Sequence, residues 1–202
     1  MISVSVTILL MLITVGLSLW AWSNENILYK LALSSYDASH YKQYYRLLTS
    51  GFVHIDFMHL GFNMLAMYGF GHTVEFAFVN KFGFIGELMY VAMYLLVIIV
   101  ANLPGYQKYK NDSRHISLGA SGGISALVLM SVLFSPMSIV TFFFIPMPAI
   151  MMGVLFIGYS YYMGRNQYDN VDHECHLYGA LCGIIAVLFL FPEVIVNFSD
   201  NF

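Results

Sequence analysis

The chain has 202 residues, of which 59% are hydrophobic and 9% charged. Soluble domains carry about 25% charged residues and need them to cover their surface, so this composition excludes an ordinary soluble protein. An aromatic content of 17% excludes intrinsic disorder, and a net charge of −3 gives no reason to expect a nucleic-acid partner.

Apolar stretches follow one another along the chain, separated by clusters of Asn, Asp, Lys, Gly and Pro. In lipid the backbone must satisfy its own hydrogen bonds, so each stretch is expected to be a helix. The sequence therefore predicts an all-α membrane protein, a single domain over residues 1–202 with six transmembrane helices. These spans are expected near 2–22, 57–74, 84–101, 119–135, 143–163 and 175–192.

The first stretch is interpreted as a retained span rather than a signal peptide. No Lys or Arg precedes it, and its apolar run exceeds the usual signal core of about 7–15 residues. The loop that follows, 23–56, mixes tyrosines with charged residues, which suits a loop lying in the headgroup layer of the bilayer. Cys175 and Cys182 are about 10.5 Å apart along one helix, too far for a disulfide.

Strongly polar residues inside a span are costly and indicate function by default. His59 and Asn63 lie in the second predicted span, Ser121 in the fourth and His176 in the sixth. Even-numbered spans run in the same direction, so these residues share one face of the membrane and a similar depth. Each alone is more often a hydrogen-bonding partner of a neighbouring helix. Four such residues at one depth in the membrane favour a functional site.

Ser121 lies in Gly119-Ala120-Ser121-Gly122-Gly123, where a polar loop gives way to an apolar run. A serine at a helix N-terminus has unpaired backbone N–H groups and the positive end of the helix dipole beside it, which suit an oxyanion hole. The alternative is a Gly-Ser turn in which Ser121 only caps the helix.

A nucleophilic serine needs a base, and His176 is the candidate. Gly179 and Gly183 follow it at small-xxx-small spacing, and Gly122 and Ala126 form a matching pair in the fourth span. Because no Asp or Glu lies at that depth in the second or fourth span, a Ser121/His176 dyad fits better than a triad. His59 and Asn63 would then complete the oxyanion hole.

This combination resembles the rhomboid family of intramembrane serine proteases, over about Tyr45 to Gly183. The motifs that carry the resemblance are Gly119-Ala120-Ser121-Gly122, the pair His59 and Asn63, and His176 before Gly179. His54 matches a further family histidine ahead of the second span. Glu75 resembles the acidic residue that ends that span, and Arg46 the arginine of a Trp-Arg motif in the first loop.

The resemblance implies a rhomboid-like bundle with a long membrane-associated first loop, which cleaves transmembrane protein substrates near the membrane surface. It implies no metal, no cofactor and no obligate partner, and a multi-pass protein of the bacterial inner membrane. Ser121 would attack the scissile carbonyl, His176 would act as base and then as acid, and the Ser121 N–H, His59 and Asn63 would hold the oxyanion. The fifth span, with Pro146 and Pro148, and loop 164–174 are the expected gate and cap.

Two residues depart from the family pattern. Tyr45 replaces the tryptophan of Trp-Arg, and Ser125 stands four residues after the serine, where an aromatic often stacks on the catalytic histidine. The orientation of His176 therefore has less support than in the family.

Other functions fit the residues less well. Gly119-x-Ser121-x-Gly123 also matches a nucleophile elbow, which needs a preceding strand. His173-Glu174-Cys175-His176 offers metal ligands at a spacing that differs from a zinc protease motif. A relative that binds or chaperones transmembrane clients without cutting would lack Ser121 or His176, and a transporter would show a repeat.

The expected orientation is in conflict with the charge distribution. Under the positive-inside rule the long-loop face would be cytoplasmic, whereas the resemblance implies that this face points outward. Seven of the 8 Lys and Arg residues lie on the long-loop face: Lys30, Lys42, Arg46, Lys108, Lys110, Arg114 and Arg165.

Overall fold

The computed structural model describes residues 5–142, 145–166 and 171–199. Within these residues, long helices occupy the positions of the six expected spans. They are α1 (Val6–Trp22), α5 (Phe57–Phe82), α6 (Phe84–Tyr109), α7 (Ser121–Phe134), α8 (Ala149–Asn166) and α9 (His173–Leu190). By length and composition, α6 and α9 could cross a membrane, while α1 and α7 are apolar but shorter. The long helices are therefore confirmed, but six membrane crossings are not.

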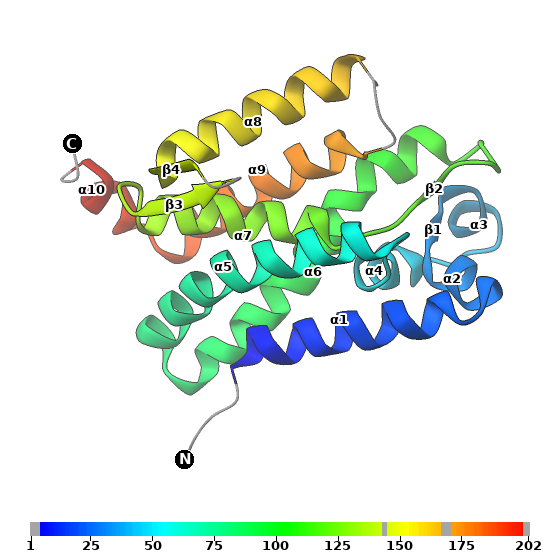
Figure 1. Ribbon diagram of the computed structural model, residues 1–202, viewed down its shortest axis with the longest axis horizontal. Coiled ribbons are helices and arrows are strands. Elements are labelled where there is room, and N and C mark those ends of the chain that lie inside the picture. Colours follow the sequence, from blue (N-terminus) through cyan, green and yellow to red (C-terminus); the bar gives the residue numbers. More distant parts are fainter. Residues whose placement is uncertain (1–4, 143–144, 167–170, 200–202) are drawn as a thin grey trace.

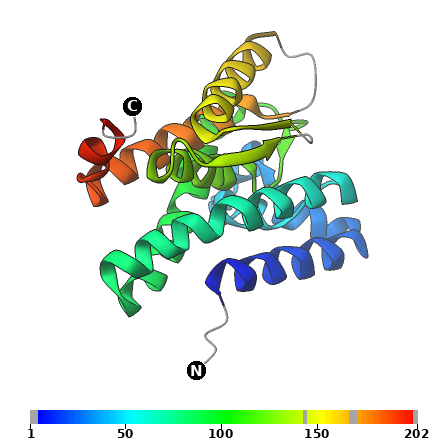
Figure 2. The same ribbon diagram turned by 60° about the vertical axis from the view of Figure 1, so that its left-hand side comes forward.

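The central helix is α7, which packs against α5, α6, α8 and α9 (Figures 1 and 2). It is 14 residues long and is buried continuously from Gly122 to Val132. Helices α1 and α8 lie on opposite outer sides, α1 against α5 and α8 mainly against α9 (Figure 1). The residues that open α7 thus lie inside the bundle.

The segment between α1 and α5 folds into short elements at one end of the bundle (Figure 1). There β1 pairs antiparallel with β2, which comes just before α7, so this segment is tied to the loop that leads into α7. The elements of this segment are α2 (Glu25–Leu31), β1 (Leu33–Ser34), α3 (Ser35–His40), α4 (Arg46–Thr49) and the 3-10 helix η1 (Ser50–Phe52), and the strand β2 that pairs with it spans Ile116–Ser117.

Several predicted boundaries are wrong because hydropathy marks the edge of the lipid-facing run rather than the end of the helix. Helix α5 continues to Phe82 and α6 starts at Phe84, so the expected loop 75–83 shrinks to Gly83, whose φ is +64°. Helix α6 continues through Pro104 to Tyr109, well into the expected loop 102–118. Polar residues can extend a helix beyond the apolar run.

The expected fifth span starts too early. β3 (Ile139–Phe142) and β4 (Ile145–Pro148) form an antiparallel pair, and α8 begins only at Ala149. Pro146 and Pro148 explain this, because proline lacks the N–H that a helix interior needs and disfavours helix in the preceding residue. The prediction of an all-α fold is therefore wrong for the β1–β2 and β3–β4 pairs. Residues 143–144, 167–170 of the expected cap, and 2–4 of the first span lie outside the described residues.

Candidate active site

Ser121 is the first residue of α7. The N-cap is Ala120, which has a helical backbone conformation and makes no side-chain cap, so Ser121 does not act as the capping residue. The hydrogen bond from Ile124 N–H to the Ala120 carbonyl, at 3.0 Å, spans the first turn. The N–H groups of Ser121, Gly122 and Gly123 precede it and have no acceptor within the helix. These N–H groups are hydrogen-bond donors, and the dipole of α7 adds a positive potential beside them. An oxyanion at this position would be stabilised by both.

Gly119 holds the turn before Ser121 in a conformation that only glycine adopts readily. Its φ is +127°, and its N–H donates to the Ser50 carbonyl at 2.9 Å. A Cβ at this position would come within 2.6 Å of His59 Cε1 and 2.9 Å of His59 Nε2. The His59 ring therefore lies directly against the backbone two residues before Ser121.

His54 fixes the same turn from the other side. The Ala120 N–H donates to His54 Nε2 at 3.3 Å, and His54 Nδ1 lies 3.1 Å from Ser18 Oγ. Since Nε2 accepts, we infer that Nδ1 carries the proton and donates to Ser18, whose hydroxyl donates to the Phe52 carbonyl at 3.3 Å. Burial, with the nearby His59 imidazole, lowers the pKa of His54 to about 3, so the ring is neutral.

The backbones of α7 and α9 approach each other closely beside Ser121. A Cβ on Gly179 would overlap the Gly122 carbonyl oxygen and lie 2.8 Å from the carbonyl carbon, and a Cβ on Gly183 would lie 2.6 Å from the Ala126 carbonyl oxygen. A Cβ on Gly122 would lie 2.6 Å from Cys175 Sγ. Gly122 adjoins Ser121 and Cys175 adjoins His176. The first turn of α7 therefore packs on the first turn of α9.

Asn63 lies one turn after His59 on α5 and is buried. Its amide nitrogen donates to the His59 carbonyl at 2.8 Å, which uses one of its two amide protons. The other proton can serve a second acceptor.

Rings from α8 and α9 contact His176. The Phe156 ring stacks on the imidazole with centroids 6.1 Å apart and planes 25° apart. His173, one turn earlier on α9, contacts the same imidazole edge to face at 5.5 Å. Ser125 is buried, and its hydroxyl donates to the Ser121 carbonyl at 2.6 Å.

Arg46 and Glu75 lie apart from this group. Arg46 is buried in the first loop, where it donates to the Tyr29 and Ala32 carbonyls and to Gln43 Oε1 and pairs with Asp37 at 3.3 Å. Its role is to hold that loop together.

Glu75 does not end the second helix, because α5 continues for a further seven residues to Phe82. It is separated from His59 by 16 positions, or about 24 Å along α5. Its carboxylate accepts hydrogen bonds from the N-terminus of α1, namely Val6 N–H at 2.8 Å, Thr7 N–H at 3.0 Å and Ser5 Oγ at 2.6 Å.

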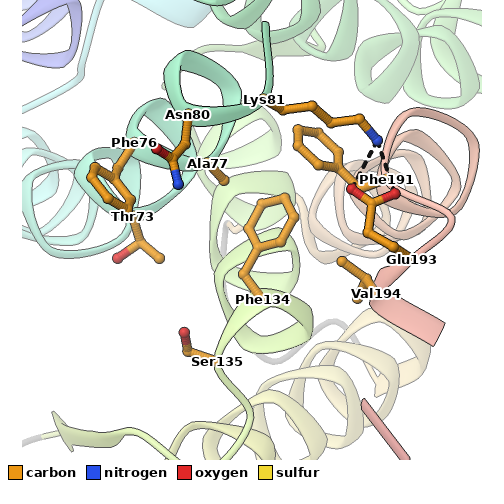
Figure 3. Close-up of a pocket in the computed structure, with 10 residues that line it drawn as sticks. All are labelled: Thr73, Phe76, Ala77, Asn80, Lys81, Phe134, Ser135, Phe191, Glu193 and Val194. Carbon is orange, nitrogen blue, oxygen red and sulfur yellow. Dashed lines mark hydrogen bonds and ion pairs between the residues drawn. The ribbon is translucent and has the colours of Figure 1, made fainter. Parts of the chain in front are cut away.

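A hollow of about 430 Å³ opens at the opposite end of the bundle from Ser121 (Figure 3). Its mouth is bridged by Lys81, which bonds to both carboxylate oxygens of Glu193 at 2.8 Å. Lys81 holds the Glu193 carboxyl at a lowered pKa through this hydrogen bond. The lining residues are Thr73, Phe76, Ala77, Asn80, Lys81, Phe134, Ser135, Phe191, Glu193 and Val194. None of the site residues expected from the sequence lines it.

Within the described residues, no group of three or more His, Cys, Asp and Glu side chains is placed to hold a metal ion. His173, Glu174, Cys175 and His176 follow one another in the first turn of α9, but among the described residues they do not form such a group.

Sequence reasoning missed Phe156, Ser18 and Ser50. Phe156 lies in an apolar helix among many aromatic residues. The signal in the sequence is its spacing: Phe156 and Tyr159 are three residues apart, as His173 and His176 are. Ser18 and Ser50 act through the His54 ring and the Gly119 N–H, contacts that depend on tertiary packing.

Comparison with known proteins gives two matches. The model of the rhomboid domain matches residues 41–193. The chain is also 28% identical, over 176 residues, to the RHOMBOID-like protein 12, mitochondrial, of Arabidopsis thaliana. This alignment covers 83% of the chain and 52% of the plant protein, so the chain spans about half the length of that relative. The relative is mitochondrial, so the comparison does not support the expected bacterial inner membrane. Because the domain match covers most of the sequence, the chain belongs to the rhomboid family of membrane proteins.

Proposed function

We propose that this chain is an intramembrane serine endopeptidase that cleaves transmembrane protein substrates near the membrane surface. The observation that supports this most strongly is the backbone contact between Gly122 and Gly179, which packs the turn of Ser121 against the turn of His176. Helices meet this closely only where neither carries a side chain, which is the purpose of a small-xxx-small face.

In the proposed reaction His176 takes the proton of the Ser121 hydroxyl as that oxygen attacks the scissile carbonyl. The oxyanion that forms is held by the Ser121 N–H at the start of α7, by His59 and by the second amide proton of Asn63. His176 then gives its proton to the leaving amine, and water hydrolyses the acyl-enzyme. His54, through the Ala120 N–H, keeps the start of α7 in place.

The test uses the purified protein in detergent with a reporter transmembrane substrate and a serine-directed phosphonate. The parent should cleave and become labelled, while Ser121→Ala and His176→Ala should do neither. Ser131→Ala, on the same helix, is the matched control and should behave as the parent. Labelling that persists in Ser121→Ala refutes the proposal.

A second candidate is a family member that binds transmembrane clients without cutting. The observation that favours it is Ser125, which supplies no ring to His176 from α7. Client capture by a parent that neither cleaves nor becomes labelled would support this function.

A further inference from the structure

A continuous cluster of four rings connects α8 to α9. Phe156 stacks on His176, His176 contacts His173, and the Tyr159 ring contacts His173 edge to face at 5.6 Å. Phe156 and Tyr159 are one turn apart on α8, and His173 and His176 are one turn apart on α9. The two helices therefore meet through paired rings on facing turns.

An imidazole that acts as a base must present one nitrogen to the serine in a fixed direction. Stacked and edge-to-face contacts have preferred geometries, so rings that pack on the imidazole restrict its rotation about the side-chain bonds. The α7 position one turn after Ser121 holds Ser125, whose short hydroxyl is engaged with the Ser121 carbonyl at 2.6 Å. The ring contact described for His176 on the α8 side comes from Phe156.

Phe156 is well placed for this role. Its ring is half-buried and packs against the core, whereas the side chain of Leu155, the residue before it, is 50% exposed. The ring planes of Phe156 and His176 differ by 25°, so the two rings are close to parallel rather than edge to face.

Resting on the proposed function, we propose that Phe156 is a positioning residue for His176. From α8, its ring packs on the imidazole, which Ser125 of α7 does not do because it has no ring. Phe156 has no contact with substrate in this role and acts only through the imidazole. Because α8 is the outermost helix on its side of the bundle, the orientation of the base depends on α8 lying against α9 (Figure 1).

The test compares Phe156→Leu, which keeps the bulk but removes the ring, with Phe156→Tyr, which keeps the ring. Leu155→Ala, on the exposed side of the same helix, is the matched control. Stacking contacts contribute about 0.5–1.5 kcal/mol, so Phe156→Leu should lower kcat and the rate of phosphonate labelling by about 2- to 13-fold. KM should stay near the parent value, and Phe156→Tyr should restore the rates.

A second measurement does not depend on activity. The ring-proton resonance of His176, assigned from its absence in His176→Gln, should carry a ring-current shift that disappears in Phe156→Leu and persists in Phe156→Tyr. Equal labelling rates in Phe156→Leu and the parent, or a resonance that does not move, overturn the positioning role. Failure of the parent itself to be labelled overturns the proposed function, so the two failures are distinguishable.

Discussion

Gly179→Ala tests whether the contact between α7 and α9 governs both stability and chemistry. The added methyl would lie 2.8 Å from the Gly122 carbonyl carbon and closer still to its oxygen, whereas ordinary contacts begin at 3.4 Å. All the clashing atoms belong to the backbone, so no side chain can rotate away. The helices must separate by at least about 0.6 Å at this level, which follows from the difference between these distances.

Overpacking of this kind costs about 1–3 kcal/mol, and the better helix propensity of alanine returns about 1 kcal/mol or less. We expect a net loss of about 1–2 kcal/mol, or a fall of about 2–8 °C in the unfolding temperature in detergent. The same displacement separates Ser121 from His176, and misplacements near 1 Å reduce rates by up to about 100-fold. Cleavage and phosphonate labelling should therefore fall by about 10- to 100-fold.

The matched control is Gly69→Ala, on α5, where an added Cβ meets nothing within 4 Å. This variant should be as active as the parent and as stable or slightly more so. Gly183→Ala, whose Cβ would lie 2.6 Å from the Ala126 carbonyl oxygen, should destabilise the protein in the same way. Gly179→Ala with parental stability and parental activity refutes the reasoning.

Three further predictions concern residues that support the bundle: His54 at the turn before α7, Arg46 in the first loop and Glu75 at the start of α1. The contribution of His54 to the free energy of unfolding should be fully present above pH 6.5 and should fall by about 3 kcal/mol between pH 6.5 and pH 4. Burial lowers the pKa of His54 to about 3, so the unfolded chain takes up the proton at a higher pH than the folded chain. Unfolding of the parent and of His54→Gln measured against pH checks this, and an equal pH slope in both contradicts it. Arg46→Ala should cost about 3 kcal/mol, since Asp37 and two carbonyls lose a buried partner, and limited proteolysis should cut first within residues 25–45. Glu75→Leu should lower the free energy of unfolding by about 2 kcal/mol and loosen the start of α1, which faster hydrogen exchange at Val6 and Thr7 would show. Phosphonate labelling of Ser121 should change little in this variant, and a large loss of labelling would place Glu75 in the reaction.

The positions of the long helices and the contact of the small residues were predictable from the sequence. Gly122 and Ala126 do face Gly179 and Gly183, because helix periodicity puts residues four apart on one side and only small residues permit so close an approach. The two-residue β pairs, the continuation of α5 and α6 beyond their apolar runs, and the α1 cap at Glu75 were not predictable in this way. Each depends on partners distant in sequence: β1 on β2, and Glu75 on Val6 and Thr7.

For the candidate site, the sequence predicted the residues themselves, whereas the contacts that hold them in place were found in the structure. His59 and Ser121 were selected as polar residues at one depth and Gly119 as part of the serine motif, and the ring of His59 lies on Gly119. The His54 contact with Ala120 and the Phe156 contact with His176 follow from how α1, α8 and the turn before α7 pack, which no local pattern specifies.

The shortness of α7 has a consequence for how water would reach the proposed reaction. A helix of 14 residues rises about 21 Å, whereas the hydrocarbon core of a bilayer is about 30 Å thick. If the Phe134 end reaches one boundary of the core, Ser121 lies about 9 Å short of the other. The folded elements between α1 and α5 and the turn held by Gly119 lie at that end. The polar backbone of these segments would therefore lie at a depth where a longer helix would be in contact with lipid. In the proposed reaction, the hydrolytic water can then come from the aqueous phase at that end of the bundle.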